Sequence, residues 1–289
     1  MRVFAFLVLA LQTTFSVRTE LVVLPVTVTD ARGHHVSGLT IDHFRVLDNG
    51  RPTTIATFQS GEVPITIGLV VDHSQSMRSK LPSVTAAASA FARLAHHDDE
   101  FFVVMFSNVV RRPRFSDGDP FTSDPTALDA ALAARLPGGP TALYDAVADA
   151  LRHLPLGTSP RKALIVITDG GDNASQLKYH EVRALARQSQ AVIYGVGLVG
   201  ANSQDENPEA LKQLCRDSGG IAYFPTPNDV GTVFDQIALD LREQYTLSIN
   251  AGAAIAGKSS HSLTVKALGV DGRPLKVRTR SGYDLHIEK

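Results

Sequence analysis

Residues 64–77 read PITIGLVVDHSQSM, and this stretch decides the fold of the chain. A largely apolar run ends at Asp72, after which Ser74 and Ser76 follow at alternate positions. A run rich in valine and isoleucine predicts a parallel strand that is buried on both faces of a sheet. Open α/β sheets bind their ligands at the carboxyl ends of such strands. We therefore expect Asp72 to lie, ionised, at the mouth of a ligand site.

Apolar strands that alternate with amphipathic helices continue along the chain as far as residue 243. We expect strands at 64–72, 100–107, 162–169, 191–197 and 220–224, and helices near 80–95, 126–135, 141–154, 178–189, 208–217 and 228–242. This alternation is typical of α/β proteins in which helices cover both faces of a mostly parallel sheet. Residues 63–243 are therefore predicted to form a Rossmann-like, doubly wound domain.

Two flanking segments alternate apolar and polar residues, a period of two that predicts β-strands. One covers residues 18–62, where Asp-Asn-Gly-Arg-Pro at 48–52 marks a turn, and the other covers residues 244–289. Neither end alone has enough strands for two layers, and lone hairpins are only marginally stable. We expect both ends of the chain to pack together as one small β-sandwich beside the α/β domain.

Residues 1–17 fit the pattern of a secretory signal peptide. Arg2 precedes an apolar run, Val3 to Leu11, which is shorter than the roughly 20 residues that span a bilayer. The alternative is that this segment forms a first strand of the fold. The signal-peptide interpretation predicts a secreted, periplasmic or cell-envelope protein with no stable membrane span.

The overall composition is that of a globular protein and gives no sign of a nucleic-acid partner. Of the 289 residues, 44% are hydrophobic and 20% are charged, and the net charge is −1. A chain so close to neutral, without a long basic run, has no general attraction to polyanions. Its one cysteine, Cys215, excludes an intramolecular disulfide and a cysteine-based zinc site, and its helical spacing predicts a buried core residue.

Two glycine motifs suggest a nucleotide, and their context argues against both. GAAIAGKS at 252–259 matches the phosphate-binding loop of nucleotide hydrolases, but a strand follows it at Leu263 where that loop requires a helix. GVGLVG at 195–200 matches the dinucleotide motif, but a polar loop follows its third glycine and its strand comes late in the sheet. We expect that no nucleotide binds at either motif.

Oxygen-bearing side chains gather at the carboxyl ends of the predicted strands. The set comprises Asp72, Ser74 and Ser76 after the first strand, Asp169 after another strand, and Thr141 at the start of a helix. Magnesium and calcium prefer oxygen ligands, and the first three side chains converge if the chain turns tightly after Asp72. The alternative is that a serine, Ser76 or Ser79, merely caps the helix at 80–95.

This set resembles the metal-ion-dependent adhesion site of von Willebrand factor type A (VWA) domains. The flanking segments resemble exported bacterial proteins of the acidobacterial-type VWFA-related family, so the resemblance covers nearly the whole mature chain. It implies one exchangeable Mg²⁺, Mn²⁺ or Ca²⁺ held through Asp72, Ser74, Ser76, Thr141 and Asp169. It also implies that the ion takes an Asp or Glu carboxylate of a protein partner, and that the chain is not an enzyme.

Three residues depart from the family pattern. Gln75 stands where the family usually has glycine, which tolerates backbone angles that glutamine does not, and Pro140 stiffens the loop before Thr141. His73 stands where a small or neutral residue is usual. As a general base it would support an alternative function, a metal-assisted hydrolase that uses the same ion. However, neighbours on an extended segment point in opposite directions, which argues against a pairing of His73 with Ser74.

Two other polar stretches are interpreted as having no metal site. HHDDE at 96–100 looks like a metal cluster, but five consecutive residues before a strand are expected to form an exposed turn. Asp172 and Asn173 resemble part of a calcium loop, but the twelve-residue spacing with its closing glutamate is absent.

Overall fold

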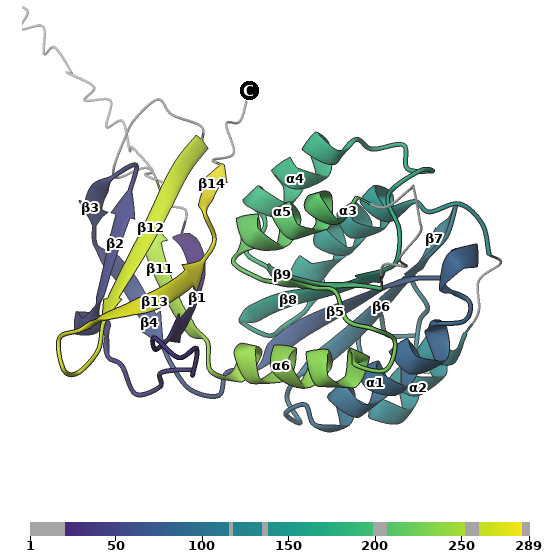
Figure 1. Cartoon of the computed structure of the whole chain (residues 1–289), viewed down its shortest axis with the longest axis horizontal. Helices are drawn as coiled ribbons and strands as arrows, with labels where there is room; N and C mark the ends of the chain where they lie inside the picture. Colours follow the sequence, from purple (N-terminus) through teal and green to yellow (C-terminus); the bar gives the residue numbers. More distant parts are fainter. Residues whose placement is uncertain (1–20, 116–117, 135–137, 199–206, 252–259, 285–289) are drawn as a thin grey trace, which may run out of the picture.

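The computed structural model describes residues 21–115, 118–134, 138–198, 207–251 and 260–284 (Figure 1). A β-sandwich and an α/β domain lie side by side in this view. Both ends of the described chain contribute strands to the sandwich, and the part between them forms the α/β domain. The predicted signal peptide, residues 1–17, lies outside the described residues. Within the described ranges, no helix is long and apolar enough to cross a membrane.

The α/β domain is built, in the described part of the chain, on a six-stranded sheet. In spatial order its strands are β10 (Ala222–Tyr223), β9 (Val192–Gly197), β8 (Arg161–Thr168), β5 (Ile65–Asp72), β6 (Glu100–Phe106) and β7 (Val110–Arg111). All neighbours are parallel except β7, which is antiparallel to β6. The sequence pattern does not predict β7, because two residues at a sheet edge give no periodicity. Strand β5 is buried along its whole length, as its apolar sequence predicts.

Helices cover both faces of this sheet. On one face lie α1 (Leu81–Arg93), α2 (Pro125–Ala133) and α6 (Val230–Arg242), and on the other lie α3 (Leu143–His153), α4 (Tyr179–Gln188) and α5 (Pro208–Ser218). Neighbouring residues of β5 supply the two cores: Leu69 packs on the side of α1 and α6, and Val70 packs on the side of α3 and α5. The predicted doubly wound α/β fold is confirmed.

The β-sandwich is one antiparallel sheet, eight-stranded within the described residues. Its amino-terminal strands are β1 (Leu21–Thr29), β2 (Phe44–Asp48), β3 (Arg51–Thr53) and β4 (Ile55–Gln59), and its carboxyl-terminal strands are β11 (Tyr245–Asn250), β12 (Ser260–Leu268), β13 (Pro274–Thr279) and β14 (Gly282–Asp284). Their order is β3-β2-β12-β13-β1-β11-β4, and β14 pairs with β12. The strands from the two ends of the chain therefore interleave, and neither set forms the sheet alone.

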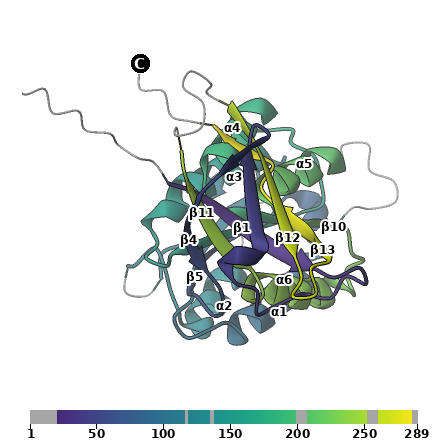
Figure 2. The ribbon, with the colours of Figure 1, turned by 90° about the vertical axis from the view of Figure 1, so that its left-hand side faces the viewer.

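Figure 2 shows this sheet from the sandwich side, with β11 on one side of β1 and with β12 and β13 on the other. Because β13 pairs with both β1 and β12, it joins the two layers. Apolar residues from both chain ends, including Leu24, Phe44, Leu247 and Val265, form one core between the layers. The prediction of a small sandwich made from both chain ends is confirmed.

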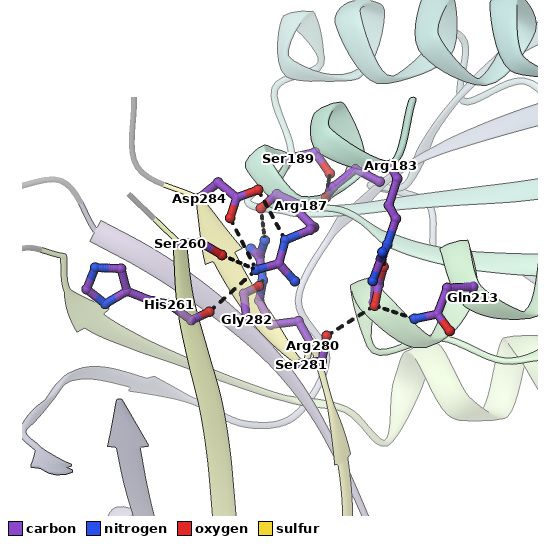
Figure 3. A network of polar contacts seen from close by, with 12 residues as sticks. Arg183, Arg187, Ser189, Gln213, Ser260, His261, Arg280, Ser281, Gly282 and Asp284 are labelled. Carbon is purple, nitrogen blue, oxygen red and sulfur yellow. Dashed lines mark hydrogen bonds and ion pairs between the residues drawn. The ribbon is translucent and has the colours of Figure 1, made fainter. Parts of the chain in front are cut away.

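A partly buried polar cluster joins the sandwich to the α/β domain, as Figure 3 shows. Arg187 of α4 donates hydrogen bonds to both carboxylate oxygens of Asp284 in β14, at 3.1 and 3.2 Å. Arg280, which is 3% exposed, donates to the backbone carbonyls of Arg187 and Gly282. Burial, and then the nearby charge of Arg187, lowers the pKa of Arg280 to about 10, so this guanidinium remains charged at neutral pH.

Asp217 of α5 forms the second part of this cluster. Its carboxylate accepts hydrogen bonds from Arg183 at 2.5 Å, from Gln213 at 2.7 Å and from Ser281 at 3.2 Å. Because Ser281 lies between β13 and β14, Asp217 links the sandwich to α4 and α5. The junction, as we call this cluster, comprises Arg183, Arg187, Asp217, Arg280 and Asp284.

The sandwich lies at the end of the α/β sheet where β5 begins. The chain passes from β4 of the sandwich to Ile65, the first residue of β5, and returns from the carboxyl end of α6 to β11. Asp72 lies at the opposite end of β5. The predicted metal site therefore faces away from the sandwich (Figure 1).

Candidate metal centre

The loop after β5 brings the first three predicted ligands together. Ser74 donates its backbone N–H to Asp72 Oδ1 at 2.7 Å, which turns the chain back onto the carboxylate directly after the strand. A short 3-10 helix, η2 (Gln75–Met77), then places the hydroxyl oxygens of Ser74 and Ser76 3.2 Å apart. Ser74 is buried whereas Ser76 is exposed, so the cluster opens to solvent at Ser76. The tight turn that convergence requires is present.

Asp169 joins the cluster from the residue after β8. Its Oδ1 accepts a hydrogen bond from Ser76 Oγ at 2.8 Å, and its Oδ2 accepts one from Lys80 Nζ at 2.5 Å. Lys80 Nζ also donates to the carbonyl oxygen of Leu198 at 2.8 Å. Strands β5 and β8 are neighbours, yet the chain continues from β5 to β6 on the other side. This is the switch point of the sheet, where open α/β proteins bind ligands.

Thr168 supports Asp72, a role that the sequence did not reveal. Its Oγ1 donates to Asp72 Oδ2 at 2.6 Å. Both carboxylate oxygens of Asp72 therefore accept hydrogen bonds from the protein. The sequence places Thr168 beside Asp169, but only the packing of β8 against β5 shows that its hydroxyl reaches Asp72.

Thr141 lies on the adjoining loop, between the two loops that carry the other predicted ligands. On one side, Gln75 donates its backbone N–H to the carbonyl of Gly139 at 3.3 Å. On the other, Thr141 donates its backbone N–H to Asn173 Oδ1 at 2.6 Å, and its carbonyl accepts the Asn173 N–H at 3.0 Å. Four of the five predicted residues thus form one hydrogen-bonded cluster, and Thr141 is anchored beside them.

The loop after Asp169 also fixes the start of α3. Asp172 Oδ1 accepts the backbone N–H of Tyr144 at 3.1 Å, which satisfies a donor of the first helical turn. Asp172 and Asn173 therefore position the Thr141 loop. Both side chains accept backbone N–H groups at this position.

Burial raises the pKa of Asp72 from 3.8 to about 6. The largest cause is desolvation, since Asp72 is 0% exposed; hydrogen bonds from Thr168 and Ser74 oppose it, and the charge of Asp169 adds to it. This corrects the expectation that Asp72 lies at the mouth of the site, because its carboxylate forms the floor. Asp72 is still mainly ionised at pH 7. A buried carboxylate beside a second one is an environment that a cation stabilises.

The oxygen spacing of the cluster fits a small divalent cation. Mg²⁺ binds oxygens at about 2.0–2.1 Å in octahedral geometry, which places adjacent ligand oxygens roughly 3 Å apart. The distances from Ser76 Oγ to Ser74 Oγ and to Asp169 Oδ1, 3.2 and 2.8 Å, have this spacing. Calcium and manganese also take oxygen ligands. The residues present therefore fit the ion that the sequence predicts.

Gln75 occupies its position without backbone strain. In the described part of the chain, Asn49 is the only residue other than glycine with a positive φ. A Cβ added at Gly138 would come within 2.7 Å of Gln75 Oε1, so the two loops are in close contact there. Glutamine in place of glycine therefore adds a contact between the loops that carry Ser74 and Thr141.

The helix-cap alternative for the serines is wrong. The N-cap of α1 is Lys80, and Ser76 instead donates its hydroxyl to Asp169.

His73 is 5% exposed and donates its backbone N–H to the carbonyl of Phe106 at 2.6 Å. Its side chain is therefore buried beside the cluster.

The stretch at 96–100 is an exposed turn only in part. The side chains of His97 and Asp98 are 79% and 54% exposed, and together with His96 they bring ligand atoms within 4.8 Å of one another. Asp99, in contrast, is fully buried and pairs with Arg242 at 2.5 Å. It also accepts the backbone N–H of Ile65 at 3.0 Å, so it fixes the start of β5.

Cys215 of α5 is fully buried in the core of the α/β domain, as its spacing predicts, and burial raises its pKa.

Strand β12 follows the motif at 252–259, so the predicted strand is confirmed, whereas the motif itself lies outside the described residues. The same holds for Val199 and Gly200 of the second motif. Among the described residues, the helix that follows β9 is α5, which begins at Pro208.

The fold and the cluster define a class: a doubly wound α/β domain whose switch point carries two carboxylates and several hydroxyls. The von Willebrand factor type A domain family matches residues 66–236, which is more than half of the chain. The chain belongs to this family, whose domains generally mediate protein–protein interactions.

Solved structures have the same fold at low sequence identity. A von Willebrand factor type A protein from Catenulispora acidiphila is 14% identical with a TM-score of 0.53, over 91% of this chain and 73% of that one. The proximal thread matrix protein 1 of the mussel byssus is 15% identical with a TM-score of 0.52, over 66% of this chain. The chain spans about half the length of that mussel protein, 49%.

A third similar structure is the corresponding domain of a type V pili tip protein from Porphyromonas gingivalis. It is 15% identical with a TM-score of 0.51, over 62% of this chain and 95% of that one. At these identities the likeness shows the fold alone. No curated protein matches the sequence.

Proposed function

We propose that this chain is an exported, metal-ion-dependent protein-binding module. One divalent cation is held by Asp72, Ser74, Ser76, Thr141 and Asp169, and a free coordination position takes an Asp or Glu carboxylate of a protein partner. The observation that carries the proposal is the hydrogen-bonded cluster of four of these residues at the switch point, open to solvent at Ser76. The general role of the family in protein interaction supports it.

The ligand chemistry suits binding of a carboxylate. The hydroxyls of Ser74, Ser76 and Thr141 are neutral metal ligands, so they hold the cation without cancelling its charge. Asp72 already accepts hydrogen bonds from Ser74 and Thr168, which suits contact with the ion through water. A divalent ion in this setting keeps net positive charge, and Mg²⁺, Mn²⁺ or Ca²⁺ then attracts an anionic side chain.

A metal-assisted hydrolase that uses the same ion is the alternative function. It requires a general base that reaches the substrate near the ion. His73 is the only base that the motif offers, and it is 5% exposed. This burial favours partner binding over turnover.

The partner test compares the full mature chain with its Asp72→Asn variant as bait for a native cell-envelope extract, in magnesium and in EDTA. We expect proteins that the wild type retains only in magnesium and that the variant does not retain. Equal retention in EDTA would contradict the proposal. The export test is N-terminal sequencing of protein expressed with its leader, for which we expect a mature chain that starts near residue 18.

A further inference from the structure

We infer that Lys80, as the counter-ion of Asp169, places a fixed positive charge at the metal centre. This charge weakens the binding of the cation and keeps the bound cation attractive to a partner's carboxylate. The inference rests on the proposed function, because it concerns the same site. It names the residue that sets the balance between affinity for the metal and affinity for the partner.

The contacts of Lys80 place its charge at the metal centre. Its Nζ lies 2.5 Å from Asp169 Oδ2 and 2.8 Å from the carbonyl oxygen of Leu198. The side chains of Lys80 and Asp169 are 20% and 2% exposed, so solvent and salt screen their interaction much less than that of a surface pair. Lys80 takes Oδ2 while Oδ1 faces Ser76, so Asp169 can serve the ammonium and a cation at the same time.

The start of helix α1 does not explain a lysine at this position. Lys80 is the N-cap of α1 and makes no side-chain capping bond, and the first turn holds no acidic residue. Helix N-termini favour Ser, Thr, Asp or Asn as caps and disfavour positive charge. A lysine here is unfavourable for the helix, and its side chain instead reaches the ends of β8 and β9. Its contacts with Asp169 and Leu198 account for its presence.

The charge balance of the cluster follows from these contacts. Asp72 and Asp169 contribute two negative charges, and Lys80 contributes one positive charge. A divalent ion therefore leaves the centre with a net positive charge, whereas the same ion without Lys80 would leave it neutral. The ammonium repels the metal, and the positive charge that remains attracts an incoming carboxylate.

Mg²⁺ titration calorimetry on the full mature chain compares the wild type with Lys80→Met at pH 7.5. Removal of one positive charge within several ångströms of the ion should tighten Mg²⁺ binding by about tenfold or more. Lys266→Met is the matched control: it removes the same charge from the outer face of β12 in the sandwich, and its Mg²⁺ affinity should equal that of the wild type.

A second measurement should move in the opposite direction. Acetate serves as the carboxylate probe, and its binding to the Mn²⁺-loaded chain is followed by water proton relaxation. We expect acetate to bind severalfold more weakly to Lys80→Met than to the wild type. If Lys80 only supported the fold, its replacement would not raise the affinity for Mg²⁺ and at the same time lower the affinity for acetate.

The outcomes separate this inference from the proposed function. If the wild type binds Mg²⁺ and Lys80→Met binds it equally or more weakly, the inference is wrong and the metal site stands. If neither binds Mg²⁺, Mn²⁺ or Ca²⁺ at millimolar concentration, the proposed metal centre falls and the inference falls with it. Circular dichroism and thermal unfolding monitor the fold, and Lys80→Gln, which retains a donor for Asp169 and Leu198, replaces the methionine variant if that variant does not fold.

Discussion

At the junction three arginines meet two aspartates, whereas at the metal centre one lysine meets two aspartates. The junction carboxylates of Asp217 and Asp284 are paired with guanidinium groups, and the surplus arginine, Arg280, donates to backbone carbonyls. At the metal centre Asp72 is paired only with neutral donors, and solvent reaches the cluster at Ser76. At the junction the protein's own arginines balance the charge of both carboxylates. At the metal centre the charge of Asp72 is left for a bound cation to balance. The two ends of one domain therefore use charged side chains for different purposes.

The largest expected effect comes from deletion of residues 244–289, which removes β11 to β14 and the sandwich side of the junction. Strand β1 then loses both of its neighbours, β11 and β13. We expect the amides of β1 to lose nearly all of their protection in hydrogen-exchange mass spectrometry. Unchanged protection of residues 21–29 would show that the two chain ends do not depend on each other.

Asp72→Asn should remove the response to metal while keeping the fold. The amide retains hydrogen-bonding groups for the Ser74 N–H and the Thr168 hydroxyl, which alanine would leave unpaired, so stability in EDTA should change by about 1 kcal/mol at most. The wild type should melt at a higher temperature in excess magnesium than in EDTA, because a ligand that binds only the folded state stabilises it. The variant should melt at the same temperature in both. A magnesium-dependent rise in the variant would place the site elsewhere.

Asp217→Asn is the corresponding change at the junction. It leaves Arg183, Gln213 and Ser281 without their charged acceptor, and we expect a loss of about 2 kcal/mol in the free energy of unfolding. The loss should be the same in magnesium and in EDTA, measured by urea unfolding. A loss that appears only in one of the two buffers would couple the junction to the metal centre and overturn the comparison.

Acidification should weaken metal binding. The folded-state pKa of Asp72, about 6, lies above the usual 3.8, so the folded protein binds a proton between these values where the unfolded chain does not. In the absence of metal, Asp72 therefore contributes less stability as the pH rises from 4 to 6. Protons compete with the cation below pH 6, and Mg²⁺ affinity at pH 5 should be about tenfold lower than at pH 7. Equal affinities at the two pH values in calorimetry would contradict the role of Asp72.

Much of the fold and part of the site can be predicted from the sequence, and the reasons are specific. The unbroken apolar run before Asp72 marks a buried parallel strand, and strand ends give the places of Asp72 and Asp169. The parts that cannot be predicted depend on contacts between distant segments. Thr168 and Lys80 reach their acceptors only because β5, β8 and β9 are neighbours, and Asp99 is buried because Arg242 from α6 lies against it.

The most direct measurement is anomalous diffraction at the manganese edge from crystals of the mature chain soaked in Mn²⁺. We predict one strong peak in contact with the hydroxyl oxygens of Ser74 and Ser76, at about 2.2 Å from each. Crystals of the Asp72→Asn variant, soaked in the same way, should lack this peak. Ordered density for both serines without a peak between them, or a peak only at His96, His97 and Asp98, would contradict the account.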